Sequence, residues 1–98
     1  MAQIVEALND ILNTLHKALM YLQNGQVLYA YRQMGYLRTE LNSPLDQSGT
    51  KARTVSLIMT RLKKGEQIDA YDDIKSLIDQ FEKMRKLIIS GENNDSPK

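Results

Sequence analysis

The stretch from Ile4 to Leu22, IVEALNDILNTLHKALMYL, decides the fold of this chain. Apolar residues recur along it at alternating steps of four and three, which is the spacing of one face of an α-helix. These residues are Ile4, Leu8, Ile11, Leu15, Ala18 and Leu22. A second row, formed by Val5, Leu12 and Leu19, widens the face into a broad apolar stripe. Because one helix of this kind is not stable alone in water, the rest of the chain must supply surfaces that cover it.

Three further segments repeat the helical spacing, so the sequence predicts an all-α, antiparallel four-helix bundle. The predicted helices span residues 3–23, 26–42, 51–64 and 70–90. Pro44 and Gly49 interrupt the pattern between the second and third helices, where Ser48 or Thr50 is expected to cap the third. Asp69 is expected to cap the fourth helix and Gly91 to end it. We therefore predict one domain over residues 1–91 and a flexible C-terminal tail over residues 92–98.

Length and composition narrow the class of protein. The 98 residues are enough for one domain, and 42% hydrophobic with 26% charged residues is typical of a folded protein. A formal charge of +1 gives no overall field that would attract nucleic acid or an anionic membrane. The chain contains no cysteine, no signal-peptide pattern and no apolar stretch long enough for a membrane span. We expect a cytoplasmic protein without membrane insertion.

The residues that catalysis or metal binding requires are scarce. His16 is the only histidine, and no cysteine is present to join it as a metal ligand. Asp69, Asp72 and Asp73 stand at the predicted start of the fourth helix, where capping and the helix dipole explain carboxylates without a metal. The glycines do not form a phosphate-binding loop. We predict that the protein is not an enzyme, with no catalytic residue, no bound metal and no cofactor.

The second predicted helix carries a candidate partner-binding surface. At 100° per residue, Tyr29, Arg32 and Tyr36 point away from the apolar seam of that helix, and Leu28 lies beside them. Tyr and Arg are enriched at the centres of protein–protein interfaces, so this surface predicts a protein partner. The alternative is that the same side chains only cover neighbouring helices. Gly35, inside this helix, suggests a close helix contact.

The third predicted helix is basic. Residues 51–65 include five basic and no acidic side chains, namely Lys51, Arg53, Arg61, Lys63 and Lys64. One interpretation is a phosphate-binding patch, which makes a nucleic-acid-binding or phage-type regulatory protein the alternative function. The other is that basic residues near a helix C-terminus complement the helix dipole. A further alternative is a structural homodimer in which the apolar seams form the interface.

The segment Arg53-Thr54-Val55-Ser56-Leu57-Ile58-Met59-Thr60-Arg61-Leu62 resembles the third-helix segment of the class IIa (pediocin-like) bacteriocin immunity proteins. The hinge and the acid-started helix that follow also look similar. This resemblance implies a cytosolic four-helix bundle that protects a bacteriocin-producing cell by acting on the bacteriocin-bound mannose transporter of its membrane. The chain departs from the family in its polar tail, which lacks a family-like aromatic C-terminal end. The resemblance therefore assigns no residue beyond Val55–Leu62.

Overall fold

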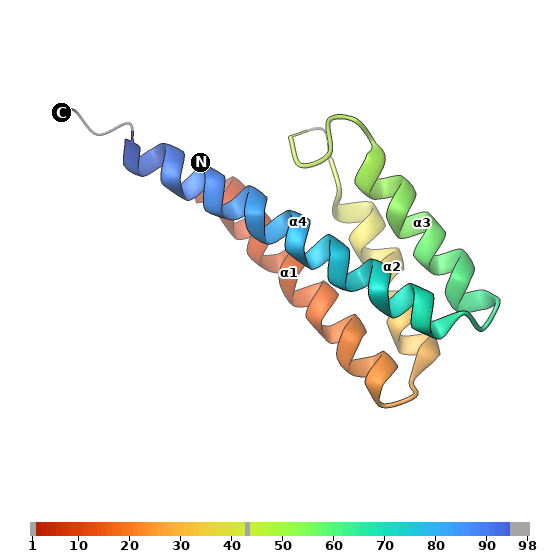
Figure 1. The fold of residues 1–98 in the computed structure, drawn as a ribbon. Coiled ribbons are helices and arrows are strands. Elements are labelled where there is room, and N and C mark those ends of the chain that lie inside the picture. Colours follow the sequence, from red (N-terminus) through yellow and green to blue (C-terminus); the bar gives the residue numbers. More distant parts are fainter. Residues whose placement is uncertain (1, 43, 95–98) are drawn as a thin grey trace.

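Four α-helices are present in the parts of the chain that the computed structural model describes, residues 2–42 and 44–94. They are α1 (Ala2–Gln23), α2 (Val27–Glu40), α3 (Thr50–Lys63) and α4 (Gln67–Asn94). Each helix packs against its neighbours in the chain, and α4 closes the bundle by packing against α1 (Figure 1). The predicted all-α, four-helix architecture is confirmed. Within the described ranges, no helix is both long and apolar enough to cross a membrane.

The core is built from the predicted seams. Its buried side chains are Leu8, Ile11, Leu12, Leu15, Ala18, Leu22, Ala30, Met34, Leu37, Leu45, Val55, Ile58, Leu62, Ala70, Ile74, Leu77, Ile78 and Phe81. None of the buried side chains in the described residues is polar or charged. Leu45 lies outside every predicted helix and reaches the core from the loop between α2 and α3.

The helices differ in length, and this difference shapes the molecule. At about 1.5 Å per residue, the 28 residues of α4 run roughly twice as far as the 14 residues of α2 or α3. The first turns of α1 and the C-terminal half of α4 therefore extend together beyond the other two helices, and the molecule is 53 Å long (Figure 1). Arg85 Nη1 donates a hydrogen bond of 2.7 Å to Asn9 Oδ1 across this pair.

Both predicted ends of the fourth helix were wrong. The helix begins at Gln67, so Asp69 lies in its first turn, near the positive end of the dipole, instead of capping it. It also continues through Gly91 to Asn94, because one glycine only weakly disfavours a helix, by about 1 kcal/mol relative to alanine. Residues 92–94 thus belong to α4, whereas residues 95–98 of the predicted flexible tail lie outside the described residues.

The start of α3 is held by a residue that the sequence did not single out. Gly49 occupies the N-cap position with a φ of 73° and provides no side chain. Asp46 accepts hydrogen bonds from the backbone N–H groups of Lys51 and Ala52 instead. Of the two predicted caps, Ser48 accepts a hydrogen bond of 3.3 Å from the backbone N–H of Thr50, the first residue of α3, and its hydroxyl also bonds to that of Thr50. The helix is therefore capped from three residues before its N-cap.

Candidate functional site

The outer face of α2 exposes large side chains in one row. Leu28 and Tyr36 are each 61% exposed and Tyr29 is 48% exposed, with Arg32 exposed between them. The opposite side of the same helix buries Ala30 and its seam neighbours, because the two sets differ by about half a turn. We call Leu28, Tyr29, Arg32 and Tyr36 the α2 outer face.

Part of the α2 outer face is stacked in place by α1. The rings of Tyr21 and Tyr29 lie with their centroids 5.4 Å apart and their planes tilted by 34°. On the same Tyr29 ring, Arg32 Cζ lies 5.9 Å from the centroid, within the range of a cation–π contact. Tyr21 was absent from the predicted set, although its place near the end of the first helix, beside the short turn, was a usable signal. This stack restrains Tyr29 and Arg32, whereas Tyr36 stands apart from it.

Gly35 faces α3, but it does not mark a close backbone approach. A Cβ atom built there would meet Met59 Cε at 3.9 Å, an ordinary van der Waals distance. Gly35 therefore does face another helix, as predicted, since Met59 belongs to α3, but the contact is not a close one. The space available does not require glycine.

The five basic residues of the third helix do not form one surface. Successive residues turn by 100°, so this spacing distributes them around the helix axis. Arg61 points to α4 and forms an ion pair with Asp73. Lys63 points to α2, where its Nζ lies 5.5 Å from the centroid of the Tyr31 ring. The half-buried Lys51 reaches over the Phe81 ring.

Arg53, Lys63 and Lys64 are exposed; Arg53 lies near the start of α3 and Lys64 directly after its last residue. Arg53 and Lys64, the two that face outward, are eleven positions apart in the chain, or about 16 Å along a helix. The structure therefore divides the predicted basic patch among three directions and leaves its two outward charges far apart.

The remaining candidates stay isolated. His16 is exposed on α1, and the described residues contain no group of three or more His, Cys, Asp and Glu side chains that could hold a metal ion. Asp73 is engaged by Arg61, and Asp69 lies in the first turn of α4. The helix-dipole role therefore fits Asp69, whereas Asp72 and Asp73 lie beyond the first turn of α4, so the prediction that the helix start explains them was wrong.

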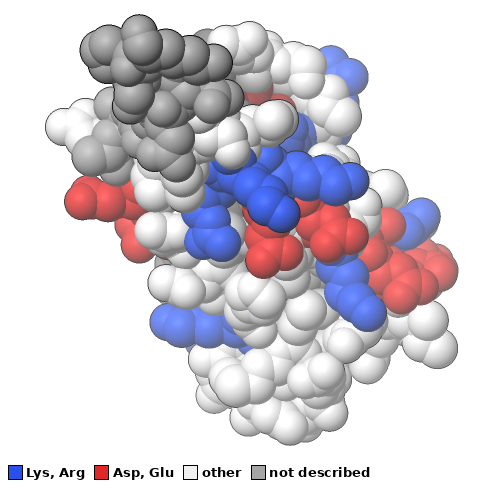
Figure 2. All heavy atoms as spheres, turned by 60° about the vertical axis from the view of Figure 1, so that its left-hand side comes forward, with Lys and Arg blue, Asp and Glu red and all other residues white. Residues whose placement is uncertain are grey.

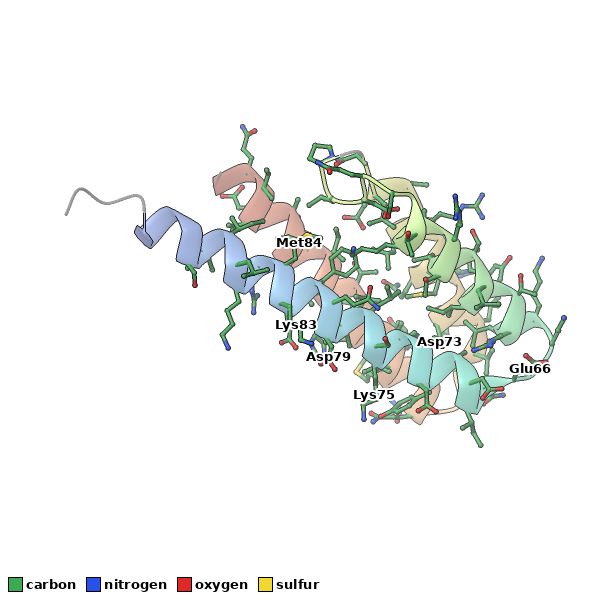
Figure 3. All side chains as sticks on the ribbon, turned by 45° about the horizontal axis from the view of Figure 1, so that its top comes forward. Glu66, Asp73, Lys75, Asp79, Lys83 and Met84 are labelled. Carbon is green, nitrogen blue, oxygen red and sulfur yellow. The ribbon has the colours of Figure 1, made fainter. Side chains whose placement is uncertain are left out.

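Charges of both signs alternate along the outer side of α4. Lys75, Asp79 and Lys83 follow one another at steps of four residues and project outward (Figure 3). Farther along, a shallow hollow of about 450 Å³ is lined by Asp79, Glu82, Lys83, Arg85, Lys86, Ile89 and Ser90. Figure 2 shows basic and acidic side chains interleaved on this side of the molecule. Alternating charges compensate one another, so this surface does not favour a ligand of either sign.

Two apolar hollows flank the end of the bundle where both short turns lie. One, of about 370 Å³, lies between α2 and α3 and is lined by Val27, Leu28, Tyr31, Leu62 and Lys63. The other, of about 200 Å³, lies between α1 and α4 and is lined by Leu22, Gln23, Gln67, Ile68 and Tyr71. Ile68, 80% exposed, was not among the predicted site residues. Its signal was present in the sequence, since it precedes the predicted start of the fourth helix and breaks an otherwise polar run.

The chain matches no protein-family model, no curated protein and no solved structure, so the geometry described above is the ground for assigning its function.

Proposed function

We propose that this protein acts without catalysis, by binding another protein through the α2 outer face. The observation that carries the proposal is that Tyr29 and Tyr36 are about half exposed or more on a helix whose opposite side is fully buried. Large amphipathic side chains with few rotatable bonds lose little entropy when a partner covers them. The stack of Tyr21, Tyr29 and Arg32 reduces the entropy lost on binding further, because Tyr29 and Arg32, two of the four side chains of the α2 outer face, are already restrained.

The most specific version of this proposal is immunity against a pediocin-like bacteriocin. Its support is the resemblance of residues 53–62, which lie within α3 of a four-helix bundle. In this version the partner is the membrane transporter complex that the bacteriocin occupies, and the protein approaches it from the cytoplasm. The role needs no cofactor and no insertion of this chain into the membrane.

The nucleic-acid alternative has less support. A phosphate-binding helix gains affinity by presenting several cations to one backbone, and affinity of this kind falls steeply with salt. Here Arg61 and Lys63 face neighbouring helices, which leaves Arg53 and Lys64 as the outward charges of the set. The homodimer alternative also has less support, because most of the seam residues that would form its interface are buried inside one chain.

A binding experiment with one substitution tests the proposal. Immobilised wild-type protein is compared with Tyr36→Ala in retaining proteins from a bacterial lysate, at low and at moderate salt. Tyr36 is chosen because it stands outside the stack and is 61% exposed, so its removal should leave the fold intact, as circular dichroism would check. Leu57→Ala, at a side chain 45% exposed on α3, is the matched control. We expect a protein retained at moderate salt by the wild type and the control, and lost with Tyr36→Ala.

Two other results would reject this function. Equal retention by Tyr36→Ala and the wild type would remove the α2 outer face as the binding surface. Recovery of nucleic acid alone, released as salt rises, would favour the alternative instead. The immunity version has its own test, in which a bacteriocin-sensitive strain expresses the wild type, Tyr36→Ala or Leu87→Ala, a control on α4 at a side chain 73% exposed and outside residues 53–62. Survival with the wild type and Leu87→Ala but not with Tyr36→Ala is expected, and killing of all three strains would reject immunity while leaving the binding result unaffected.

A further inference from the structure

The two halves of the chain repeat one helical-hairpin unit at an offset of 40 residues. The first turn and its flanks read Leu22-Gln-Asn-Gly25-Gln-Val-Leu28-Tyr-Ala30-Tyr31, and the second read Leu62-Lys-Lys-Gly65-Glu-Gln-Ile68-Asp-Ala70-Tyr71. Leucine, glycine, alanine and tyrosine recur at the same places, with an aliphatic residue at the position of Leu28 and Ile68. The pattern continues into the core, where Met34 and Leu37 correspond to Ile74 and Leu77.

The backbone repeats the same turn. Gly25 and Gly65 have φ values of 75° and 80°, in the left-handed region that ends many helices. The N–H of Gly25 bonds to the carbonyl of Leu22 at 3.1 Å, and the N–H of Gly65 bonds to that of Leu62 at 3.2 Å. The next residue along bonds back by five positions in both turns. One end of the bundle therefore contains two turns with the same backbone structure.

The contacts between the two halves also correspond at the offset of 40 residues. Gln23, at the end of α1, donates a hydrogen bond of 3.0 Å to Tyr71 Oη of α4. Its counterpart Lys63, at the end of α3, lies over the ring of Tyr31 of α2. These contacts relate α1 to α3 and α2 to α4 by an approximate two-fold axis along the bundle at this end.

The two apolar hollows obey the same relationship. Adding 40 to Val27, Leu28 and Tyr31 gives Gln67, Ile68 and Tyr71, and subtracting 40 from Leu62 and Lys63 gives Leu22 and Gln23. One end of the protein thus presents two hollows at corresponding positions, of about 370 and 200 Å³, each with a prominent aliphatic side chain, Leu28 or Ile68, at its rim.

The charges of the two turns differ, and this difference indicates which molecule could bind at this end. The first turn is neutral, with Gln23, Asn24 and Gln26. The corresponding residues of the second turn are Lys63, which lies over the Tyr31 ring, and Lys64 and Glu66, which stand on either side of Gly65. A second copy can be placed end to end by a two-fold axis that crosses the end from one turn to the other. That operation sets each hollow against the non-equivalent hollow of the other copy, and it sets Lys64 against the other copy's Glu66 twice. In this arrangement the end is self-complementary in charge, as favours an interface between identical subunits related by a two-fold axis.

We propose that this end of the bundle binds the same end of a second copy, with Leu28 and Ile68 as the apolar contacts and Lys64 and Glu66 as the charge pair. The molecule measures 25 × 18 Å across, so the end of each copy can contribute at most about 450 Å². Stable dimers bury about 800 Å² per partner, so the association is a reversible one that depends on protein concentration.

Sedimentation equilibrium of the full chain over a range from micromolar to millimolar tests the interface. We expect the average mass to rise from that of the monomer towards twice that value. Ile68→Asp should weaken association by about tenfold or more, because it places a carboxylate in an apolar contact. Leu87→Asp is the matched control, since Leu87 is 73% exposed at the far end of the same helix. A monomer at every concentration, or equal weakening by both variants, would overturn the proposal.

Charge exchange provides a second readout that a folding defect would not imitate. Lys64→Glu and Glu66→Lys should each weaken self-association, because each sets like charges together twice. Mixing the two variants should restore association, because every pair in the mixed dimer is again opposite in sign. A mixture no better than its components would reject the predicted axis. Tyr36→Ala should leave the mass unchanged, so the failure of this interface and the failure of the α2 outer face are distinguishable.

Discussion

Asp46 Oδ2 accepts a hydrogen bond from the backbone N–H of Ala52 over 2.9 Å, while its Oδ1 accepts one from Lys51 over 3.0 Å. Two of the N–H groups that the first turn of any helix leaves without an internal partner are satisfied by this single carboxylate. We expect Asp46→Ala to lower the free energy of unfolding by about 1–2 kcal/mol, the range measured for strong caps. Urea denaturation would measure it. The stability of Asp46→Asn, which keeps one acceptor oxygen, should fall between that of the wild type and that of Asp46→Ala. If Asp46→Ala lost no more stability than Asp72→Ala, a substitution at an exposed position, this role of Asp46 would be contradicted.

The loop between α2 and α3 is anchored to the core by Leu45, which is only 3% exposed. Replacing it with alanine removes buried methyl groups and leaves a cavity, at a cost of about 2–5 kcal/mol when the surroundings do not collapse. We place Leu45→Ala at the lower end of that range, since a loop relaxes more easily than a helix. Chemical denaturation of Leu45→Ala and of Leu57→Ala, which removes a half-exposed leucine from α3, measures the difference. Equal losses would show that the loop contributes no more than a surface position.

Periodicity explains which parts of the fold the sequence could predict. The helices and their inward faces follow from the three- and four-residue spacing, because that spacing and the helix share one period. Leu45 and Asp46 were missed because a loop has no period, and their roles depend on how it folds back. The end of α4 was misplaced because Gly91 lowers helix stability only slightly.

The same distinction holds for the candidate sites. The outward direction of Tyr29 and Tyr36 follows from helix geometry alone, and the structure places both on the surface. The basic patch was defined by counting charges along the chain, which ignores direction. Its members proved to point to α4, to α2 or outward. The bundle end needed a comparison between the halves of the chain, because each turn alone looks like an ordinary helix end.

Glycine substitutions should separate a conformational requirement from a dispensable glycine. Gly35 lies within α2 with room for a Cβ atom, so Gly35→Ala should stabilise the protein by about 0.5–1 kcal/mol. Gly65 has a φ of 80°, a backbone conformation that costs an L-residue roughly 1–2 kcal/mol, so Gly65→Ala should destabilise it although nothing occupies the space. Thermal or urea unfolding of both variants measures the opposite signs. A loss in Gly35→Ala would mean that Met59 cannot adjust.

Glu40, near the end of α2, should make stability depend on pH in the reverse of the usual direction for a carboxylate. Partial burial raises the pKa of Glu40 above its ordinary value of 4.5, and the negative charge of Asp10 on α1 raises it further. The folded protein then holds this proton more tightly than the unfolded chain does, so this group's contribution to stability falls as pH rises from about the ordinary value through the raised one.

Glu40→Gln removes that dependence by replacing the carboxylate with a neutral group of similar shape. We expect the variant to be more stable than the wild type at pH 7, with the difference shrinking as the pH falls below 4.5, where Glu40 is protonated in both states. Urea denaturation at pH 7 and at pH 4 gives the two differences. Asp10→Asn should reproduce part of the gain at pH 7, because it removes the smaller of the two causes while leaving the burial of Glu40 unchanged. A Gln variant less stable than the wild type at pH 7 would show instead that the charged form of Glu40 makes a favourable contact, and the coupling to Asp10 would then be too weak to govern this end of α2.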